Sequence, residues 1–263
     1  MKFSNLIALT IFLFVSVSAS AAELVTLNTR PDIQQKFILI KPATPVASVI
    51  LFAGGSGTLD LSSFSGDPTI NKRKNNFLVR TRELFTSHGF LVAVVDAPSD
   101  HSSKKGMSGG FRDSMEHAED IDRVISYLRK IADVPVWMVG TSRGTESATN
   151  LAINSSQKPA GLILTASMSV PNSKGTTVTD MDLDKIIIPT LLVAHSQDGC
   201  WVTPPEGAKE IADGLINSRK VAVKMFSGGD TPISKPCKAR SYHGFLGIED
   251  EVVGFIADFI KSN

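Results

Sequence analysis

The chain has 263 residues, of which 42% are apolar and 20% are charged, and this composition excludes a disordered or fibrous protein. A formal net charge of +1 excludes a strong overall attraction to nucleic acid or to an anionic membrane surface. The length fits one α/β domain with a core large enough to fold without extra cross-links.

The first residues predict export from the cytoplasm. Lys2 precedes a nearly unbroken apolar run over residues 6–17, and small residues follow at 19–21. The run is short for a membrane span, so we expect residues 1–21 to be a signal peptide; an uncleaved anchor is the alternative. Residues 22–263 then form the mature domain, which we expect to be secreted or periplasmic and without a stable membrane anchor.

Apolar runs alternate with helical patterns along the mature chain. We expect strands at 36–41, 48–53, 90–95, 136–139, 161–165, 189–194 and 220–226, and helices at 77–88, 113–131, 145–154, 205–216 and 249–260. This alternation predicts a mostly parallel sheet with helices on both faces. Functional residues then collect at the carboxyl ends of the strands, where we expect the loops at 54–57 and 97–112 to lie.

The strongest motif is Gly-Thr-Ser-Arg-Gly at residues 140–144, between a buried strand and a helix. In that context Gly-x-Ser-x-Gly predicts a nucleophile elbow, a sharp turn that exposes the serine hydroxyl. Gly140 and Gly144 have no Cβ, which lets the strand and helix backbones approach each other beside the serine. We therefore expect Ser142 to be a catalytic nucleophile.

A serine hydroxyl needs a neighbouring base, and the base needs an acid to fix its tautomer. His243 follows the last expected strand and is the predicted base; Asp198 follows the strand before it and is the predicted acid. An Asx turn or a helix cap is the alternative role for Asp198. We expect His195 to support the site, and His88 and His117 to lie outside it. His101, in the loop after Asp96, could reach the mouth of the site, but nothing orients it.

With the order Ser142, Asp198, His243 and the order of its strands and helices, the mature chain resembles the serine hydrolases of the α/β-hydrolase superfamily. The sequence of residues 94–100 and 140–145 is similar to that of a group of exported bacterial esterase-like hydrolases. The resemblance implies an α/β-hydrolase fold with a mostly parallel central sheet, no large cap domain and no cofactor.

The resemblance also implies two backbone donors for an oxyanion. One is the amide of Arg143, directly after the serine. The other comes from the glycine-rich loop that starts at residue 54, where Ala53 replaces the histidine common in the superfamily. Gly55 is our first choice for this donor and Ser56 the second. The alternative is a glycine turn that only permits close approach.

Two cysteines, Cys200 and Cys237, remain in the mature chain. In an oxidising compartment this even number favours one disulfide over two buried thiols. Cys200 lies two residues after Asp198, and Cys237 lies six residues before His243. The bond would therefore tether the loop of the acid to the loop of the base. Two cysteines without clustered histidines are too few ligands for a metal.

The segment at residues 166–185 is too short and too polar to form a helical lid, so we expect an open site. Trp201 is either a wall of the pocket or a packing residue. Cationic side chains occur on loops expected at the catalytic face, and these are Lys104, Lys105, Arg112, Arg143, Lys235, Lys238 and Arg240. They fit an anionic small-molecule substrate; the alternative is that they are solvated loop residues.

Together these features predict cleavage of a carboxylic ester through an acyl-enzyme intermediate. Peptide or amide cleavage by the same residues is the first alternative. The second is a non-catalytic binding protein on a hydrolase fold, although such proteins usually lack a member of the triad or an elbow glycine, and here all are present.

Overall fold

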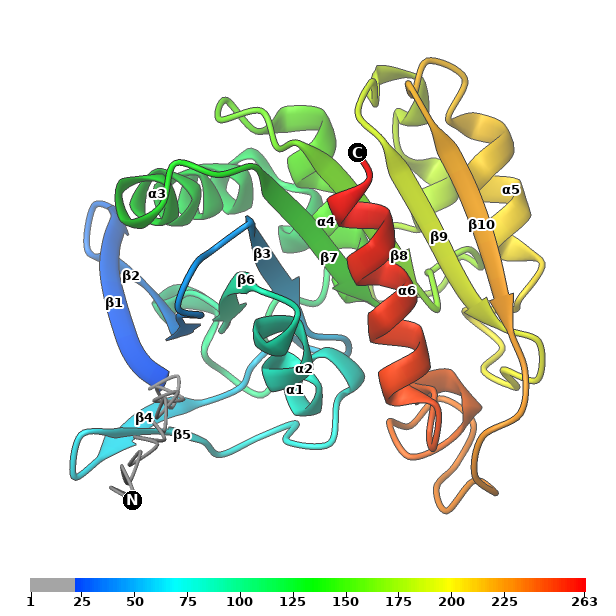
Figure 1. The fold of residues 1–263 in the computed structure, drawn as a ribbon, viewed down its shortest axis with the longest axis horizontal. Coiled ribbons are helices and arrows are strands. Elements are labelled where there is room, and N and C mark those ends of the chain that lie inside the picture. Colours follow the sequence, from blue (N-terminus) through cyan, green and yellow to red (C-terminus); the bar gives the residue numbers. More distant parts are fainter. Residues whose placement is uncertain (1–21) are drawn as a thin grey trace, which may run out of the picture.

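The computed structural model describes residues 22–263, so the expected signal peptide lies outside the described residues. An eight-stranded sheet runs through the molecule in the order β1-β2-β6-β3-β7-β8-β9-β10 (Figure 1). β2 is antiparallel to both of its neighbours, and all other neighbouring strands are parallel. The predicted mostly parallel α/β sheet is confirmed. No helix of the described chain combines the length and apolar character that a bilayer span needs.

The strands of the large sheet are β1 (Ala22–Arg30), β2 (Ile33–Ile40), β3 (Ala47–Phe52), β6 (Phe90–Val95), β7 (Val136–Thr141), β8 (Gly161–Thr165), β9 (Thr190–His195) and β10 (Val221–Phe226). A separate hairpin consists of β4 (Leu61–Phe64) and β5 (Asp67–Ile70). The helices are α1 (Phe77–Arg80), α2 (Arg82–Ser87), α3 (Met115–Ile131), α4 (Gly144–Asn154), α5 (Gly207–Gly214) and α6 (Glu249–Lys261).

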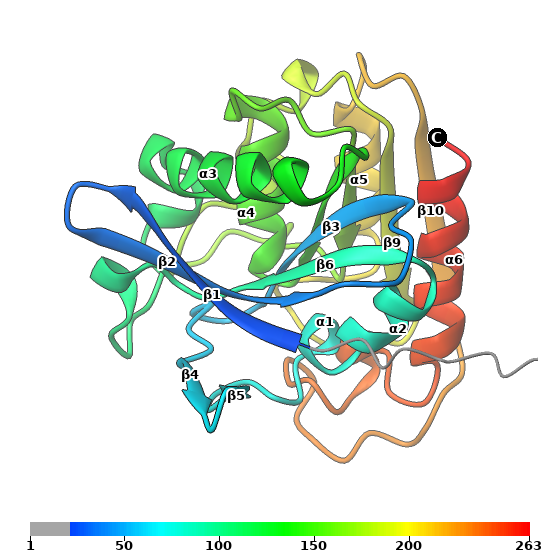
Figure 2. The same ribbon diagram turned by 60° about the vertical axis from the view of Figure 1, so that its left-hand side comes forward.

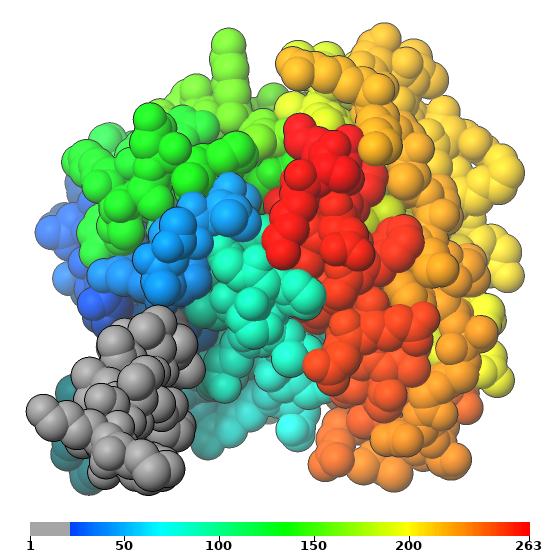
Figure 3. All heavy atoms as spheres, in the orientation of Figure 1, coloured from blue at the N-terminus to red at the C-terminus, as the bar shows by residue number. Residues whose placement is uncertain are grey.

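Alternate residues of the inner strands enter two hydrophobic cores, one on each face of the sheet. Along β3, Val49 and Leu51 pack with α1, α2 and α6, whereas Ile50 and Phe52 pack with α3, α4 and α5. Figure 2 shows α3 and α4 on one side of the strands and α1 and α2 on the other. In Figure 3, α6 (red) fills the space between the cyan segment around α1 and α2 and the orange segment after β10. Burial on both faces explains why these strands are nearly continuous apolar runs.

β3 and β7 are neighbours at the centre of the sheet, and their position determines where the site lies. They are parallel, with Phe52 of β3 opposite Gly140 of β7. Both strands therefore end at the same edge, and the loops that follow them lie side by side. The strand order also reverses here, because β6 follows β3 in sequence but lies on its other side. Such a reversal opens a crevice in α/β sheets.

Some local features differ from the sequence expectations. β1 and the hairpin β4–β5 are largely half-buried or exposed, so they lack the apolar runs of the inner strands and were not expected. The helix expected at 77–88 is divided at Thr81, whose hydroxyl donates to the carbonyl of Phe77 at 2.8 Å. Ser114, and not Asp113, caps α3 by accepting the N–H of His117 at 3.2 Å.

Two glycines with opposite surroundings test this packing. Nothing lies within 4 Å of a Cβ added to Gly254 on α6, whereas a Cβ on Gly161 of β8 would be 2.1 Å from the ring of Trp137. We expect Gly254→Ala to raise the free energy of unfolding by about 0.5–1 kcal/mol and Gly161→Ala to lower it by about 1–3 kcal/mol. Urea unfolding followed by circular dichroism measures both. Wild-type stability of Gly161→Ala would show that the Trp137 ring can move aside.

Candidate active site

The tight turn after β7 carries Ser142. This residue has a φ of 52°, a left-handed backbone that residues other than glycine adopt only under constraint. Its N–H donates to the carbonyl of Thr165 at 3.0 Å. Its carbonyl accepts hydrogen bonds from the N–H of Thr145 at 2.9 Å and from the Thr145 hydroxyl at 2.6 Å. These bonds hold the turn, and Ser142 stays partly exposed.

Gly140 and Gly144 flank the turn where other backbone segments occupy the place of a side chain. A Cβ on Gly140 would be 2.4 Å from the carbonyl oxygen of Gly144, and a Cβ on Gly144 would be 2.0 Å from that of Phe52. Backbone atoms cannot rotate aside as a flexible side chain can, so both positions require glycine. The two glycines therefore set how closely β3, β7 and α4 approach one another.

The glycine-rich loop after β3 lies against Ser142. A Cβ on Gly54 would be 2.9 Å from the Cβ of Ser142. Gly55 lines both of the hollows beside Ser142, and Ser56 lines neither. Within residues 22–263, the N–H groups of Gly55 and Arg143 donate no hydrogen bond to another protein group. Both amides are available to a bound oxyanion, and Gly55 is better placed than Ser56.

Arg112 fastens this loop from the protein interior. Its side chain is 1% exposed. One terminal nitrogen donates to the carbonyls of Ala53 at 2.9 Å and Gly55 at 3.2 Å, and the other donates to the Ser147 hydroxyl at 2.7 Å. Burial lowers the pKa of Arg112 to about 10. The expectation that Arg112 adds positive charge to the catalytic surface is wrong, because its guanidinium is buried and forms its hydrogen bonds inside the protein.

Asp198 and His243 form a buried pair. Oδ2 of Asp198 is 2.8 Å from Nδ1 of His243. An ionised carboxylate can only accept, so Nδ1 of the neutral ring carries the proton and Nε2 is left as an acceptor. Oδ1 of Asp198 accepts the N–H of Cys200 at 2.9 Å, and Oδ2 also accepts the hydroxyl of Thr203 at 3.1 Å. These bonds fix the carboxylate against the imidazole ring.

The loop of His243 is supported by neighbouring elements. Arg80, at the end of α1, donates to the carbonyl of Gly244 at 2.5 Å. His195, at the end of β9, stacks on Tyr242 with 4.7 Å between ring centroids and an interplanar angle of 17°. His195 is thus a packing partner of the residue directly before His243, which is a supporting position.

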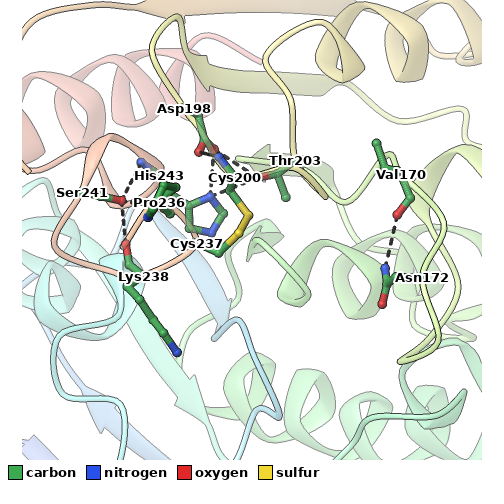
Figure 4. The surroundings of a disulfide bond; sticks show 10 residues. All are labelled: Val170, Asn172, Asp198, Cys200, Thr203, Pro236, Cys237, Lys238, Ser241 and His243. Atoms are coloured by element: carbon green, nitrogen blue, oxygen red, sulfur yellow. Dashed lines mark hydrogen bonds and ion pairs between the residues drawn. A yellow bond between two sulfur atoms is a disulfide. The ribbon is translucent and has the colours of Figure 1, made fainter. Parts of the chain in front are cut away.

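A disulfide joins the loops of Asp198 and His243 (Figure 4). The predicted pairing of Cys200 with Cys237 is confirmed. The Ser241 hydroxyl lies 2.7 Å and 2.8 Å from the two carbonyls on either side of Cys237, and Ser241 also accepts the N–H of His243 at 3.3 Å. The bond therefore connects two segments that each contact one member of the buried pair.

One hollow of about 290 Å³ beside Ser142 also contains His243. Three cationic residues line it, Arg73, Lys74 and Lys238, and no aspartate or glutamate does. This hollow brings together the predicted nucleophile, the predicted base and an uncompensated positive charge.

A second hollow, of about 390 Å³, meets the first at Ser142 and is more apolar in character. Met168, Trp201 and Val202 line it. Trp201 is 65% exposed, so it is a wall of this hollow and not a buried packing residue. The segment between β8 and β9 holds only short helical turns, and the site stays open to solvent.

The side chain of Arg143 turns inward. Its Nη1 is 2.7 Å from Oε1 of Glu146, and its other terminal nitrogen donates to the side chain of Asn172. Burial raises the pKa of Glu146 to about 7, although Arg112 and Arg143 both favour the ionised carboxylate. The expectation that Arg143 adds free positive charge to the catalytic face is wrong as well, since its guanidinium is buried and bonded to Glu146 and Asn172.

Two side chains at the site were not expected from the sequence. Thr203 lies 3.1 Å from both Asp198 and His243, and a single threonine in a loop gives no signal of such a role. Arg73 belongs to a polar stretch after β3. Its place beyond the carboxyl end of a central strand is the signal that could have assigned it to this face.

The remaining histidines are engaged elsewhere. His101 stacks on Phe111 with 3.7 Å between ring centroids, and His88 ends α2. Across residues 22–263, no three side chains of His, Cys, Asp or Glu are grouped so that they could hold a metal ion.

Comparison with protein-family models and with curated protein sequences gives no match. Solved structures do resemble this one. An esterase from Pyrococcus furiosus has a TM-score of 0.65 at 13% identity, covering 99% of this chain and 98% of its own. A carboxyl esterase from Bacillus coagulans has a TM-score of 0.61 at 16% identity, covering 93% and 99%. A dienelactone hydrolase from Anabaena variabilis has a TM-score of 0.61 at 13% identity, covering 92% and 97%. This likeness establishes the fold, which is the α/β-hydrolase fold without a large cap.

His117 predicts how stability depends on pH. The ring is fully buried, and neither nitrogen has a hydrogen-bond partner. Burial, with Arg112 nearby, lowers the pKa of His117 to about 3. The unfolded chain takes up this proton below about pH 6.5 and the folded chain does not, so stability is lost as pH falls from there towards 3. We expect this histidine to cost about 2 kcal/mol of unfolding free energy between pH 7 and pH 5.

Urea unfolding of the wild type and of His117→Leu at pH 5, 6 and 7 tests this expectation. The variant should lose the part of the pH dependence that His117 causes, whatever its absolute stability. Parallel pH profiles of the two proteins would contradict the assignment.

Proposed function

We propose that the chain is a serine hydrolase that cleaves a carboxylic ester of a small molecule. The observation that carries the proposal is the 2.8 Å bond between Asp198 and His243, whose ring lines the same hollow as Ser142. Structural neighbours named as esterases and as a dienelactone hydrolase support hydrolysis as the reaction class.

In the proposed reaction, His243 takes the hydroxyl proton of Ser142 as the serine oxygen attacks the ester carbonyl. Asp198 holds the ring in the required tautomer and stabilises the charge that the ring gains. The amides of Arg143 and Gly55 receive the oxyanion. His243 then protonates the leaving alcohol, and it later deprotonates the water that releases the acid and restores the serine. No cofactor takes part.

An ester is favoured over a peptide held by its free amine end, because no aspartate or glutamate lines the hollow at Ser142 to bind a protonated amine. The predicted signal peptide and the disulfide favour a secreted or periplasmic location, since disulfides persist in oxidising compartments.

Residues 22–263 treated with a neutral fluorophosphonate probe should be labelled at Ser142, because the probe reacts with an activated serine. Peptide mass mapping locates the label. Ser142→Ala should abolish it, and His243→Gln should slow labelling by about a thousandfold or more. Ser62→Ala, at an exposed serine of β4, is the matched control and should label like the wild type.

Absence of labelling in folded, disulfide-bonded protein would favour the non-catalytic binding protein. Labelling of Ser142 together with hydrolysis of amides but not of esters would favour the peptidase or amidase.

Reduction of the disulfide between Cys200 and Cys237 should lower ester hydrolysis before it lowers helix content, because the bond joins the acid and base loops and neither cysteine belongs to the two hydrophobic cores that hold the helices. We expect a Cys200→Ala/Cys237→Ala variant to lose about 10- to 100-fold in kcat, the range that small displacements of catalytic groups produce. Activity, far-ultraviolet circular dichroism and free thiols are followed as reductant is added. Full activity with both thiols free would disprove the positioning role.

A further inference from the structure

The guanidinium of Arg73 lies next to the loop that supplies a candidate oxyanion donor. A Cβ on Gly55 would be 2.4 Å from Nη1 of Arg73, so the guanidinium lies directly over this glycine. Nη2 donates to the hydroxyl of Ser56 at 2.6 Å. The backbone of Arg73 is left-handed, with a φ of 58°, which is uncommon for a residue with a long side chain. This conformation places the side chain on the wall of the hollow that contains Ser142.

Arg73 has no negative partner. Four arginines of the described chain pair with carboxylates, namely Arg30, Arg80, Arg82 and Arg143, and Arg73 belongs to the remainder that form no ion pair there. Arg73 instead bonds to one neutral hydroxyl and leaves most of its five N–H donors unused within the described chain. Where it lies over the loop, the guanidinium is partly withdrawn from water, and this desolvation lowers the pKa of Arg73 with no carboxylate to oppose it.

Two lysines strengthen the positive charge of the same hollow. Lys74 and Lys238 line it, and neither forms an ion pair with a side chain in residues 22–263. The formal net charge of the whole protein is only +1, so the excess of cationic residues at this hollow is not a property of the entire surface. Its charge is complementary to that of an anion.

We propose that the substrate is an ester with an oxyanionic group, and that Arg73 binds this group in the hollow shared with Ser142 and His243. The inference rests on the proposed hydrolase function and names its substrate class. Arg73 is a substrate-binding residue in this arrangement. Its planar fork of donors suits a carboxylate oxygen pair, and Lys74 and Lys238 add charge without fixed geometry.

The rival explanation is structural: Arg73 only fastens the loop through Ser56. That role would affect charged and neutral substrates alike, so a ratio between matched substrates separates the two. The first pair is meta-butyryloxybenzoate and its methyl ester, which differ in the charge of the leaving group. The second pair is para-nitrophenyl hydrogen adipate and para-nitrophenyl heptanoate, which differ in the charge of the acyl group.

We expect kcat/KM to favour the anionic member of at least one pair, and this preference to fall about 10- to 100-fold in Arg73→Gln, as for loss of a hydrogen bond to a charged group. Arg73→Lys keeps the charge and should retain part of the preference. Arg123→Gln removes one exposed charge of α3 that lines neither hollow, and it should keep the full wild-type preference. Equal hydrolysis of both members of each pair, or an unchanged preference in Arg73→Gln, would overturn the proposal.

Binding to Ser142→Ala, measured by calorimetry, separates this inference from the proposed function, because binding requires no chemistry. The anionic esters should bind more tightly than their neutral partners, and adding Arg73→Gln should remove the difference. If the wild type hydrolyses no ester but this charge-dependent binding persists, the hydrolase proposal fails and the anion site stands. If the anionic esters bind no better than the neutral ones, the anion site is refuted even when Ser142 reacts with the fluorophosphonate.

Discussion

At the carboxyl end of the sheet three backbone segments meet with no room for a side chain. The ends of β3 and β7 both contact the first turn of α4, through Phe52, Gly140 and Gly144. β3 and β7 are inner strands covered by helices on both faces, so the segments cannot separate without opening the core. The left-handed backbone at Ser142 follows from this contact. Strain of this kind costs about 1–3 kcal/mol and persists only where the surroundings over-determine the conformation.

Buried charged side chains hold the loops around Ser142 in place through hydrogen bonds and ion pairs inside the protein. Arg112 donates to carbonyls of the loop after β3, and Arg143 is paired with Glu146. The carboxylate of Asp96 accepts the N–H groups of Leu59 and Leu61 at 2.6 Å and 2.8 Å, which orders the next part of that loop. Burial of a charge costs less when hydrogen bonds replace those to water, and both terminal nitrogens of Arg112 have such partners. The loops around Ser142 therefore keep their shape without a lid. Arg73 differs from Arg112 and Arg143 because it lines the open hollow and is not enclosed by the protein.

Much of the fold could be predicted because strands buried on both faces of the sheet appear in the sequence as nearly continuous apolar runs. The turn at Ser142 could be predicted because the spacing of its two glycines forms a recognisable motif. The order of strands was enough to nominate Asp198 and His243. Edge elements such as β1 carry weaker patterns, since nearly all of their residues are at least partly exposed to solvent. Directions of long side chains could not be predicted at all. Arg112 and Arg73 look alike in a sequence, and only partners distant along the chain decide that one is enclosed and the other is not.

The disulfide also makes a covalent ring. Cys200 and Cys237 are 37 positions apart, and the ring contains α5 and β10, the strand at one edge of the sheet. A protease that cut the connection between these two elements would break the polypeptide without releasing a fragment. The piece ending after α5 and the piece beginning before β10 would stay joined through sulfur. Separation of these two pieces therefore requires reduction of the disulfide.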